Sequence, residues 1–218
     1  MTIKSFVFNP FSTNCFICHE ESEAVIVDPS CRSAAETSQV LNYVRENDLK
    51  VREMLLTHAH LDHIFGCRAV ADALGIGLRV HRDEGPLLEA AQYQARMFGF
   101  DIEQPPEPEG FLVAGEQVQV GESRWDILFT PGHSPGSVSF YDADQRYVIS
   151  GDVLFAGSIG RTDLMGASLP VLMRSIYQEL LPLGDDVTVY SGHGPTTTIG
   201  RERMVNPFLR DEPGAPTS

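Results

Sequence analysis

The chain has 218 residues, of which 42% are hydrophobic and 21% charged, and its formal net charge at pH 7 is −14. This acidic balance, without a basic stripe, argues against a nucleic acid as the main partner, and no window is apolar enough for a signal peptide or a membrane span. The length suits one domain, which we expect at residues 1–210 of a cytosolic protein, with a disordered tail at residues 211–218.

The first half of the chain alternates apolar strand patterns with helical spacing. These patterns predict, in chain order, strands at residues 6–18 and 24–28, a helix at 33–48, a strand at 51–57, a helix at 61–74, a strand at 78–81 and a helix at 86–98. Gly75 is expected to end the second helix. A Pro- and Glu-rich stretch at residues 103–110 predicts a loop between the two halves.

The second half repeats this alternation. Its patterns predict strands at residues 118–120, 125–130, 137–141 and 147–150, a helix at 169–181 and a last strand at 187–190. Ser168 precedes the helix and is expected to cap it. Strands flanked by helices in both halves indicate a layered α/β fold with two sheets inside.

The four cysteines are expected to be buried free thiols, as cytosolic thiols usually stay reduced. Cys15 and Cys18 have the spacing of a zinc or redox motif, but no second pair follows Cys31 or Cys67 with the same spacing. Phe16 and Ile17, which lie between the first two cysteines, are typical strand residues.

Five of the seven histidines lie in three short motifs, which are Thr-His-Ala-His-Leu-Asp-His at residues 57–63, Gly-His-Ser at 132–134 and Gly-His-Gly at 192–194. Neutral imidazole and carboxylate are donors that a divalent transition metal accepts. Each motif follows a predicted strand, as Asp152 also does, and loops at strand ends are where rigid sheets present functional groups. The sequence therefore predicts a metal site.

The candidate donors are too many for one tetrahedral metal ion, and their number suits two ions. The candidate donors are His58, His60, Asp62, His63, His133, Asp152 and His193. His58 and His60 are two apart in an extended segment, so they face the same side and can hold one ion. Asp62 and His63 belong to the first turn of a helix and point towards a second ion, and Asp152 could bridge both. Zinc is favoured, and iron and manganese accept the same donors.

The ordered motifs resemble those of the metallo-β-lactamase superfamily, and within it those of the short glyoxalase II-like (hydroxyacylglutathione hydrolase-like) enzymes. The resemblance is carried by residues 57–63, 131–137, 150–155, 160–163 and 192–195. It implies a four-layer αββα sandwich with a two-metal site at one edge. By the family pattern, one ion would have the ligands His58, His60 and His133, the other would have Asp62, His63 and His193, and Asp152 would bridge them.

Such a site favours hydrolysis of an activated acyl bond. A hydroxide held between two metal ions is a nucleophile at neutral pH, and a thiolate leaves without a proton because the pKa of a thiol is around 8.5. We therefore expect a small-molecule thioester as substrate, with an S-acylglutathione such as S-lactoylglutathione as its class. Asp62 or Asp152 could accept the proton of the water, and Arg161 and Arg201 could bind substrate carboxylates.

A second enzyme class stays open. The segment Gly-Arg-Thr-Asp at residues 160–163 also resembles a loop of the persulfide dioxygenases in this superfamily, which use one iron held by two histidines and one carboxylate. His58, His133 and Asp152 could supply that triad. A β-lactamase is disfavoured because many such lactamases carry Cys at the position of Asp152. Asp28, at the end of a strand, could orient a ligand histidine or form a turn before Pro29. The oligomeric state stays undetermined.

Overall fold

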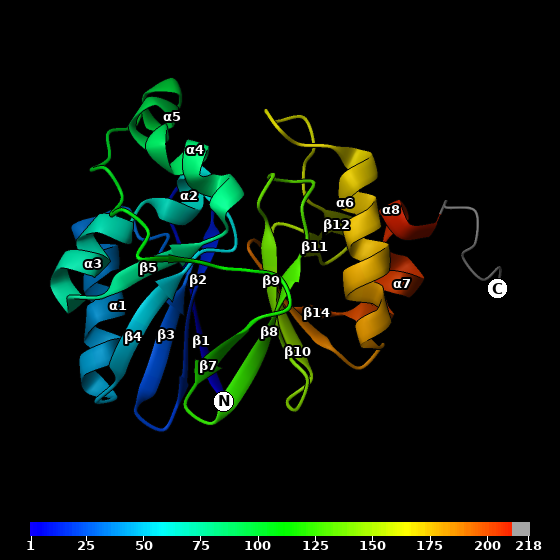
Figure 1. Cartoon of the computed structure of the whole chain (residues 1–218), viewed down its shortest axis with the longest axis horizontal. Coiled ribbons are helices and arrows are strands. Elements are labelled where there is room, and N and C mark those ends of the chain that lie inside the picture. Colours follow the sequence, from blue (N-terminus) through cyan, green and yellow to red (C-terminus); the bar gives the residue numbers. More distant parts are fainter. Residues whose placement is uncertain (211–218) are drawn as a thin grey trace.

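The computed structural model describes residues 1–210, so the tail predicted at residues 211–218 lies outside the described residues. Two six-stranded sheets pack face to face, and helices cover the outer face of each sheet (Figure 1). This is the four-layer αββα arrangement that the sequence predicted. α1 (Ala34–Glu46) and α3 (Cys67–Leu74) lie outside the first sheet, and α6 (Leu169–Ser175) and α7 (Ile199–Val205) lie outside the second.

The first sheet has its six strands in chain order. They are β1 (Thr2–Phe8), β2 (Thr13–Glu20), β3 (Glu23–Val27), β4 (Lys50–Leu55), β5 (Gly77–Val80) and β6 (Gly110–Phe111). The first three strands are antiparallel, whereas β3 to β6 are parallel to one another. The crossovers between the parallel strands carry the helices that cover this sheet.

The second sheet has the strand order β14-β13-β10-β9-β8-β7. Its strands are β7 (Gln117–Val120), β8 (Ser123–Phe129), β9 (Val138–Asp142), β10 (Tyr147–Gly151), β13 (Thr188–Ser191) and β14 (Thr197–Thr198). Among the described strands of this sheet, β10 and β13 pair in parallel and the other neighbours are antiparallel. A small hairpin of β11 (Leu154–Phe155) and β12 (Ser158–Ile159) follows β10.

Shorter helices lie at the edges of the two sheets. They are α2 (Leu61–Ile64), α4 (Gly85–Glu89) and α5 (Ala91–Met97) in the first half and α8 (Pro207–Arg210) in the second. Irregular turns complete α6, which continues through the π-helical turn Ile176–Leu180 into Leu181–Leu183. The predicted helix at residues 169–181 therefore exists, although Ser168 precedes it without a side-chain capping bond.

The strand period of two distributes apolar side chains between separate cores. In β2, Cys15 and Ile17 face the core under α1 and α3, whereas Phe16 and Cys18 face the core between the two sheets. The Cys-x-x-Cys pair therefore points to opposite sides of one strand and cannot bind one ion. All four cysteines are buried and free, as predicted. A third core lies between the second sheet and α6.

Three predicted elements are divided in the structure. The predicted strand at residues 6–18 is two strands, because Asn9 and Ser12 adopt φ values of 56° and 58° and the Asn9 side chain accepts a hydrogen bond from the backbone N–H of Phe11. The predicted helix at residues 61–74 breaks at Gly66, where a Cβ atom would lie 2.3 Å from Cys31 Sγ. Gly75 does end α3, with φ of 66°.

The helix predicted at residues 86–98 is also divided, because α4 ends at Glu89 and α5 begins at Ala91, with Ala90 between them. The helices α7 and α8 were not predicted at all. No helix among residues 1–210 is long and apolar enough to cross a membrane. The cytosolic location and the single domain stay predictions.

The core between the sheets supports the first testable prediction. Phe140 in β9 is fully buried there, so Phe140→Ala should lower the free energy of unfolding by about 3–5 kcal/mol through the cavity it leaves. The matched control is Phe208→Ala, whose side chain is 49% exposed, and it should change stability far less. Urea unfolding followed by circular dichroism measures both variants, and equal losses would contradict this description of the core.

Candidate metal centre

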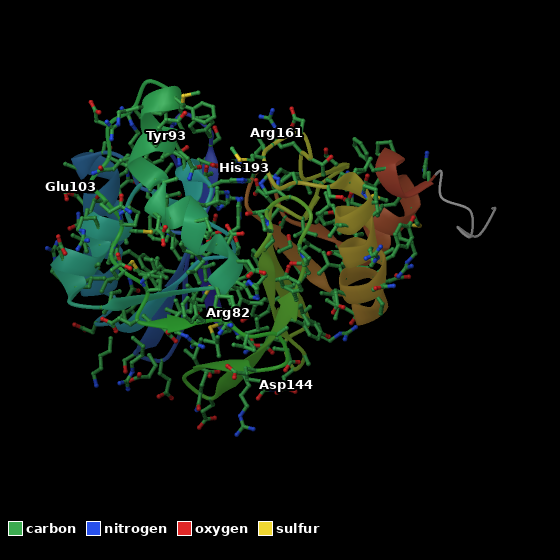
Figure 2. All side chains as sticks on the ribbon, turned by 45° about the horizontal axis from the view of Figure 1, so that its top comes forward. Arg82, Tyr93, Glu103, Asp144, Arg161 and His193 are labelled. Atoms are coloured by element: carbon green, nitrogen blue, oxygen red, sulfur yellow. The ribbon has the colours of Figure 1, made fainter. Side chains whose placement is uncertain are left out.

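All seven predicted donors come from loops or helix starts at one edge of the sandwich. His58 and His60 follow β4, and His133 follows β8. Asp152 follows β10 and His193 follows β13. Figure 2 shows His193 in the opening between the helix that carries Tyr93 and the loop that carries Arg161. Donors from both sheets therefore meet at this edge.

The donors form groups in which the candidate ligand atoms all lie within 4.8 Å of one another. The first donor group is His58, His60 and His133, and the second donor group is Asp62, His63 and His193. These are the two groups that the family resemblance implied. A third set, His58, His63 and Asp152, satisfies the same criterion and connects them.

Asp152 lies between the two donor groups. Its Oδ2 is 3.4 Å from His133 Nε2 of the first group and 3.4 Å from His193 Nε2 of the second. Its Oδ1 is 3.4 Å from His63 Nε2. Oδ2 is thus near a histidine of each group, and Oδ1 is near the second group, so the carboxylate is placed where a ligand could bridge two ions.

Three buried polar atoms of this cluster have no hydrogen-bond partner among the described residues. They are His58 Nε2, His63 Nε2 and Asp152 Oδ1. Buried polar atoms are nearly always paired, so an unpaired cluster calls for a ligand. Imidazole nitrogens and a carboxylate oxygen that converge are suitable for divalent metal ions. The residues present therefore fit a metal site, whereas the ligand assignment for each ion stays a prediction.

Burial keeps two of these histidines neutral. It lowers the pKa of His58 well below its ordinary value, and the neighbouring imidazoles of His63 and His60 lower that pKa further. Burial and the imidazole of His133 lower the pKa of His60 to about 3. A neutral imidazole keeps the lone pair that a metal ion needs.

In the second donor group the histidines are protonated beside the carboxylates, and a metal ion that binds there would displace these protons. Burial disfavours a charge on His193, but its hydrogen bonds to Asp152 and Asp62 outweigh burial and raise its pKa to about 10. Burial likewise opposes ionisation of Asp62, but the charge of His63 and the hydrogen bond from His193 lower its pKa to about 2. Burial also opposes ionisation of Asp152, but the charge of His63 and the hydrogen bond from His193 lower its pKa well below the ordinary value. The two carboxylates thus stay ionised, and they provide the negative charge that would stabilise divalent cations.

Hydrogen bonds orient four of the five histidines so that Nε2 faces the centre. His63 Nδ1 donates to Asp28 Oδ2 at 2.9 Å, and His133 Nδ1 donates to the carbonyl oxygen of Arg161 at 2.8 Å. His193 Nδ1 donates to the carbonyl oxygen of Phe11 at 3.1 Å, and His58 Nδ1 lies 3.1 Å from Thr57 Oγ1. Such partners fix the ring orientation and tautomer of a metal ligand.

Asp28 orients His63 rather than serving only as a turn residue. Its carboxylate also accepts hydrogen bonds from the Thr57 backbone N–H at 2.8 Å and from Thr57 Oγ1 at 2.6 Å. It is fully buried and adopts a φ of 50°, a left-handed conformation that is uncommon outside glycine. Of the two interpretations that the sequence left open, the structure supports the orienting one.

Glu84 is a supporting residue that the sequence analysis missed. It is fully buried, and its carboxylate accepts hydrogen bonds from the Ala59 N–H at 2.6 Å, the Gly136 N–H at 2.6 Å and the Ser134 hydroxyl. One carboxylate therefore connects the loop of His58 and His60 with the loop of His133. No sequence pattern indicated this role, since an acidic residue after a strand is usually exposed.

Gly192 is required by the close packing of the donor loops. A Cβ atom at this position would lie 2.1 Å from Asp152 Oδ1 and 2.8 Å from His63 Cε1. Any other residue would displace one of these donors. The first glycine of the Gly-His-Gly motif thus lets the end of β13 pack closely against the cluster, in addition to allowing the turn beside His193.

The cluster opens into a pocket of about 350 Å³. Phe11, Leu87, Phe98, Leu164 and Met165 line it together with Arg161 and donors from both groups. Arg161 is exposed, and its Nε and Nη2 each bond an Asp163 carboxylate oxygen at 2.7 Å. Arg201 does not line this pocket, and its guanidinium donates to Glu202. The structure thus brings only Arg161 of the two predicted arginines to the site.

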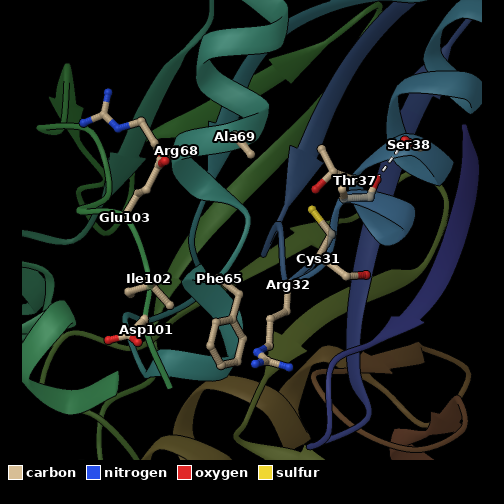
Figure 3. A pocket seen from close by; sticks show the side chains of 12 residues that line it. Cys31, Arg32, Thr37, Ser38, Phe65, Arg68, Ala69, Asp101, Ile102 and Glu103 are labelled. Atoms are coloured by element: carbon tan, nitrogen blue, oxygen red, sulfur yellow. Dashed lines mark hydrogen bonds between the residues drawn. The ribbon is translucent and has the colours of Figure 1, made fainter. Parts of the chain in front are cut away.

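A larger pocket, of about 710 Å³, lies elsewhere in the first half of the molecule. Arg32 and Thr37 line it near the start of α1, Arg68 lines it from α3, and Asp101 and Glu103 line it from the following loop (Figure 3). None of the seven donors contributes to it, so we assign the functional site to the smaller pocket.

Comparison with known proteins agrees with this geometry. The family model of the metallo-beta-lactamase superfamily matches residues 8–193, and the chain therefore belongs to this superfamily, as its motifs predicted. The hydroxyacylglutathione hydrolase GloC of Haemophilus influenzae is 34% identical over 97% of this chain and 100% of that protein.

Two solved structures share the fold closely. The B3 metallo-beta-lactamase BLEG-1 superposes with a TM-score of 0.88 at 37% identity, covering 96% of this chain and 100% of that chain. TTHA1623 in a di-iron-bound form gives a TM-score of 0.84 at 36% identity, covering 94% of this chain and 100% of that chain. The superfamily therefore includes similar proteins whose described activities differ, and one of these proteins is described with two irons bound.

The position of Glu84 generates a second prediction. Glu84→Ala removes the acceptor of two backbone N–H groups and one hydroxyl, so the free energy of unfolding should fall by about 3 kcal/mol. The affinity for metal should fall about 10–100-fold, since the two donor loops lose their connection. Competition with a chromogenic chelator, at a temperature where the variant is folded, measures this affinity.

Glu89→Ala is the control for this experiment, because Glu89 is an exposed glutamate of the adjacent helix. It should change neither stability nor metal affinity appreciably. A folded Glu84→Ala protein with unchanged metal affinity would contradict the supporting role of Glu84.

Proposed function

We propose that the chain is a metal-dependent hydrolase that cleaves thioesters, with S-acylglutathiones as the substrate class. The observation that carries this proposal is the position of Asp152 between two complete donor groups. Membership of the superfamily and the similarity to a hydroxyacylglutathione hydrolase support it. The proposed resident ions are two divalent metals, with zinc favoured.

Two divalent ions bound at the donor groups would supply an activated water molecule and would polarise the carbonyl of the substrate. The first donor group would bind one ion through three imidazoles, and the second would bind the other through two imidazoles and Asp62. Asp62 Oδ2 already accepts a hydrogen bond from Thr13 Oγ1 at 2.8 Å. Asp152 Oδ1 has no such partner among the described residues, so it is the oxygen that we expect to bind an ion or accept a proton.

A thioester suits this site for a chemical reason. A thiolate leaves without protonation at neutral pH, because the pKa of a thiol is around 8.5. An amide or an alkyl ester would require a general acid beside the leaving group. The proposed partner is thus a small molecule in the pocket beside the cluster, rather than a nucleic acid or a membrane.

The di-iron form of TTHA1623 keeps iron as a candidate metal. A persulfide dioxygenase is accordingly the second candidate function, with one iron bound by His58, His133 and Asp152. Those three residues lie in the same cluster, and His133 Nε2 is 3.4 Å from Asp152 Oδ2. The hydrolase is favoured because the chain is similar to a hydroxyacylglutathione hydrolase, and the metal content would separate the two functions.

Metal content and activity, measured on one preparation, test the proposal. We expect about two divalent ions per chain by mass spectrometry and hydrolysis of S-lactoylglutathione or another S-acylglutathione at neutral pH. Asp152→Ala should lower kcat/KM at least about 100-fold, since it removes a metal ligand and not merely a supporting group. Asp144→Ala, which changes an exposed aspartate, should leave activity unchanged.

Three results would contradict the hydrolase. One iron per chain with oxygen consumption on addition of glutathione persulfide would establish the dioxygenase instead. Cleavage of the β-lactam nitrocefin faster than of any thioester would favour the activity for which BLEG-1 is described. Intact thioesters after incubation with the fully metal-loaded protein would leave the proposal without support.

A further inference from the structure

One wall of the pocket beside the metal cluster is apolar. Phe11 comes from the turn between β1 and β2, Leu87 from α4, and Phe98 from the end of α5. The Phe11 and Phe98 rings meet edge to face with centroids 6.0 Å apart. We call Phe11, Leu87 and Phe98 the aromatic wall.

The rings of the aromatic wall are held in place and yet exposed. Phe11 also stacks on Phe65 at 6.5 Å and meets the edge of Phe100 at 5.9 Å. Even so, 40% of Phe11 and 57% of Phe98 remain accessible to solvent. Large apolar side chains that gather around a pocket, rather than lying scattered on the surface, mark a site for an apolar group.

The opposite side of the pocket is also lined by apolar side chains. Leu164 and Met165 line it from the loop that follows Arg161, and Met165 is 91% exposed. Among the described residues that line the pocket, Arg161 is the one Arg or Lys, and Asp163 already pairs with its guanidinium at two positions. The aromatic wall therefore has no unpaired Arg or Lys beside it, among the described residues that line the pocket, to bind a charged group of a substrate.

The aromatic wall begins directly at the metal cluster. The carbonyl oxygen of Phe11 accepts the hydrogen bond from His193 Nδ1, so the ring belongs to a residue that touches a donor. A substrate carbonyl that reaches the cluster must place its two substituents, the acyl chain and the thiol part, within a few atoms of this point. The thiol part of a glutathione thioester carries carboxylates and amides, which need water or Arg161.

We propose that the aromatic wall binds the acyl group, and that the preferred substrates are thioesters with apolar acyl chains rather than hydroxyacyl groups. This inference rests on the proposed thioesterase function. A lactoyl hydroxyl beside these rings would lose its hydrogen bonds to water. Gln94 lines the same side, and its Nε2 donates to the carbonyl oxygen of Leu87 at 2.7 Å.

A series of S-acylglutathiones tests this preference. From acetyl through butanoyl to hexanoyl, kcat/KM should rise about fourfold for each added methylene that the wall covers. S-lactoylglutathione should be cleaved more slowly than its butanoyl counterpart. Equal or faster cleavage of the lactoyl compound, or a series independent of chain length, would overturn the inference while the thioesterase function stands.

Variants locate the preference on the aromatic wall. Phe98→Ala should lower kcat/KM for hexanoylglutathione about 15-fold, the loss expected for two methylene contacts, and should lower it less for acetylglutathione. Phe98→Leu should recover part of the loss. The control is Tyr93→Ala, because Tyr93 is a 65% exposed aromatic residue of α5 that does not line the pocket.

Binding of uncleavable thioethers separates this inference from the proposed function. We expect calorimetry on the metal-loaded protein to show tighter binding of S-hexylglutathione than of S-methylglutathione, and the difference should shrink in Phe98→Ala. If no thioester is cleaved, the proposed function fails. The binding series then tests by itself whether the aromatic wall binds an apolar group. Equal binding of the two thioethers would overturn the inference.

Discussion

The packing of the two sheets against each other is the constraint on which the metal centre depends, because each donor group takes residues from both halves of the chain. The first group needs His133 from the second half, and the second group needs residues from the first half beside His193. Backbone hydrogen bonds join the halves at this edge, from the Val138 N–H to the Thr57 carbonyl at 2.9 Å and from the Asn14 N–H to the Gly192 carbonyl at 2.7 Å. The apolar core between the sheets thus sets the spacing of the ligands.

Two buried carboxylates that are not candidate ligands secure this arrangement locally. Asp28 holds Thr57 and the ring of His63, and Glu84 holds the backbone on either side of the first donor group. Burying a carboxylate is costly unless its oxygens receive hydrogen bonds, and both residues receive several. A donor cluster placed on such supports is ordered before an ion binds, so little of the binding free energy is spent on arranging the ligands.

Strand periodicity and histidine spacing are local signals, and they were sufficient to predict two sheets flanked by helices, most strands and the convergence of the donors. The four-layer order was implied by the resemblance of the motifs to the metallo-β-lactamase superfamily. The sequence did not reveal the turn at Asn9 or the break at Gly66, which depend on left-handed backbone and on contact with Cys31. The role of Glu84 was hidden for the same reason, since its partners are 25 and 52 residues away. The helices α7 and α8 were missed because their apolar spacing is short and weak.

The distribution of donors along the chain also gives the order in which a nascent protein can complete its ligand sets. Synthesis proceeds from the N-terminus, so all residues of the first donor group exist once residue 133 has been added. The second group waits for residue 193, and Asp152 is made between the two. The second donor group is therefore the last to be completed, although Asp62 and His63 are among the first donors made.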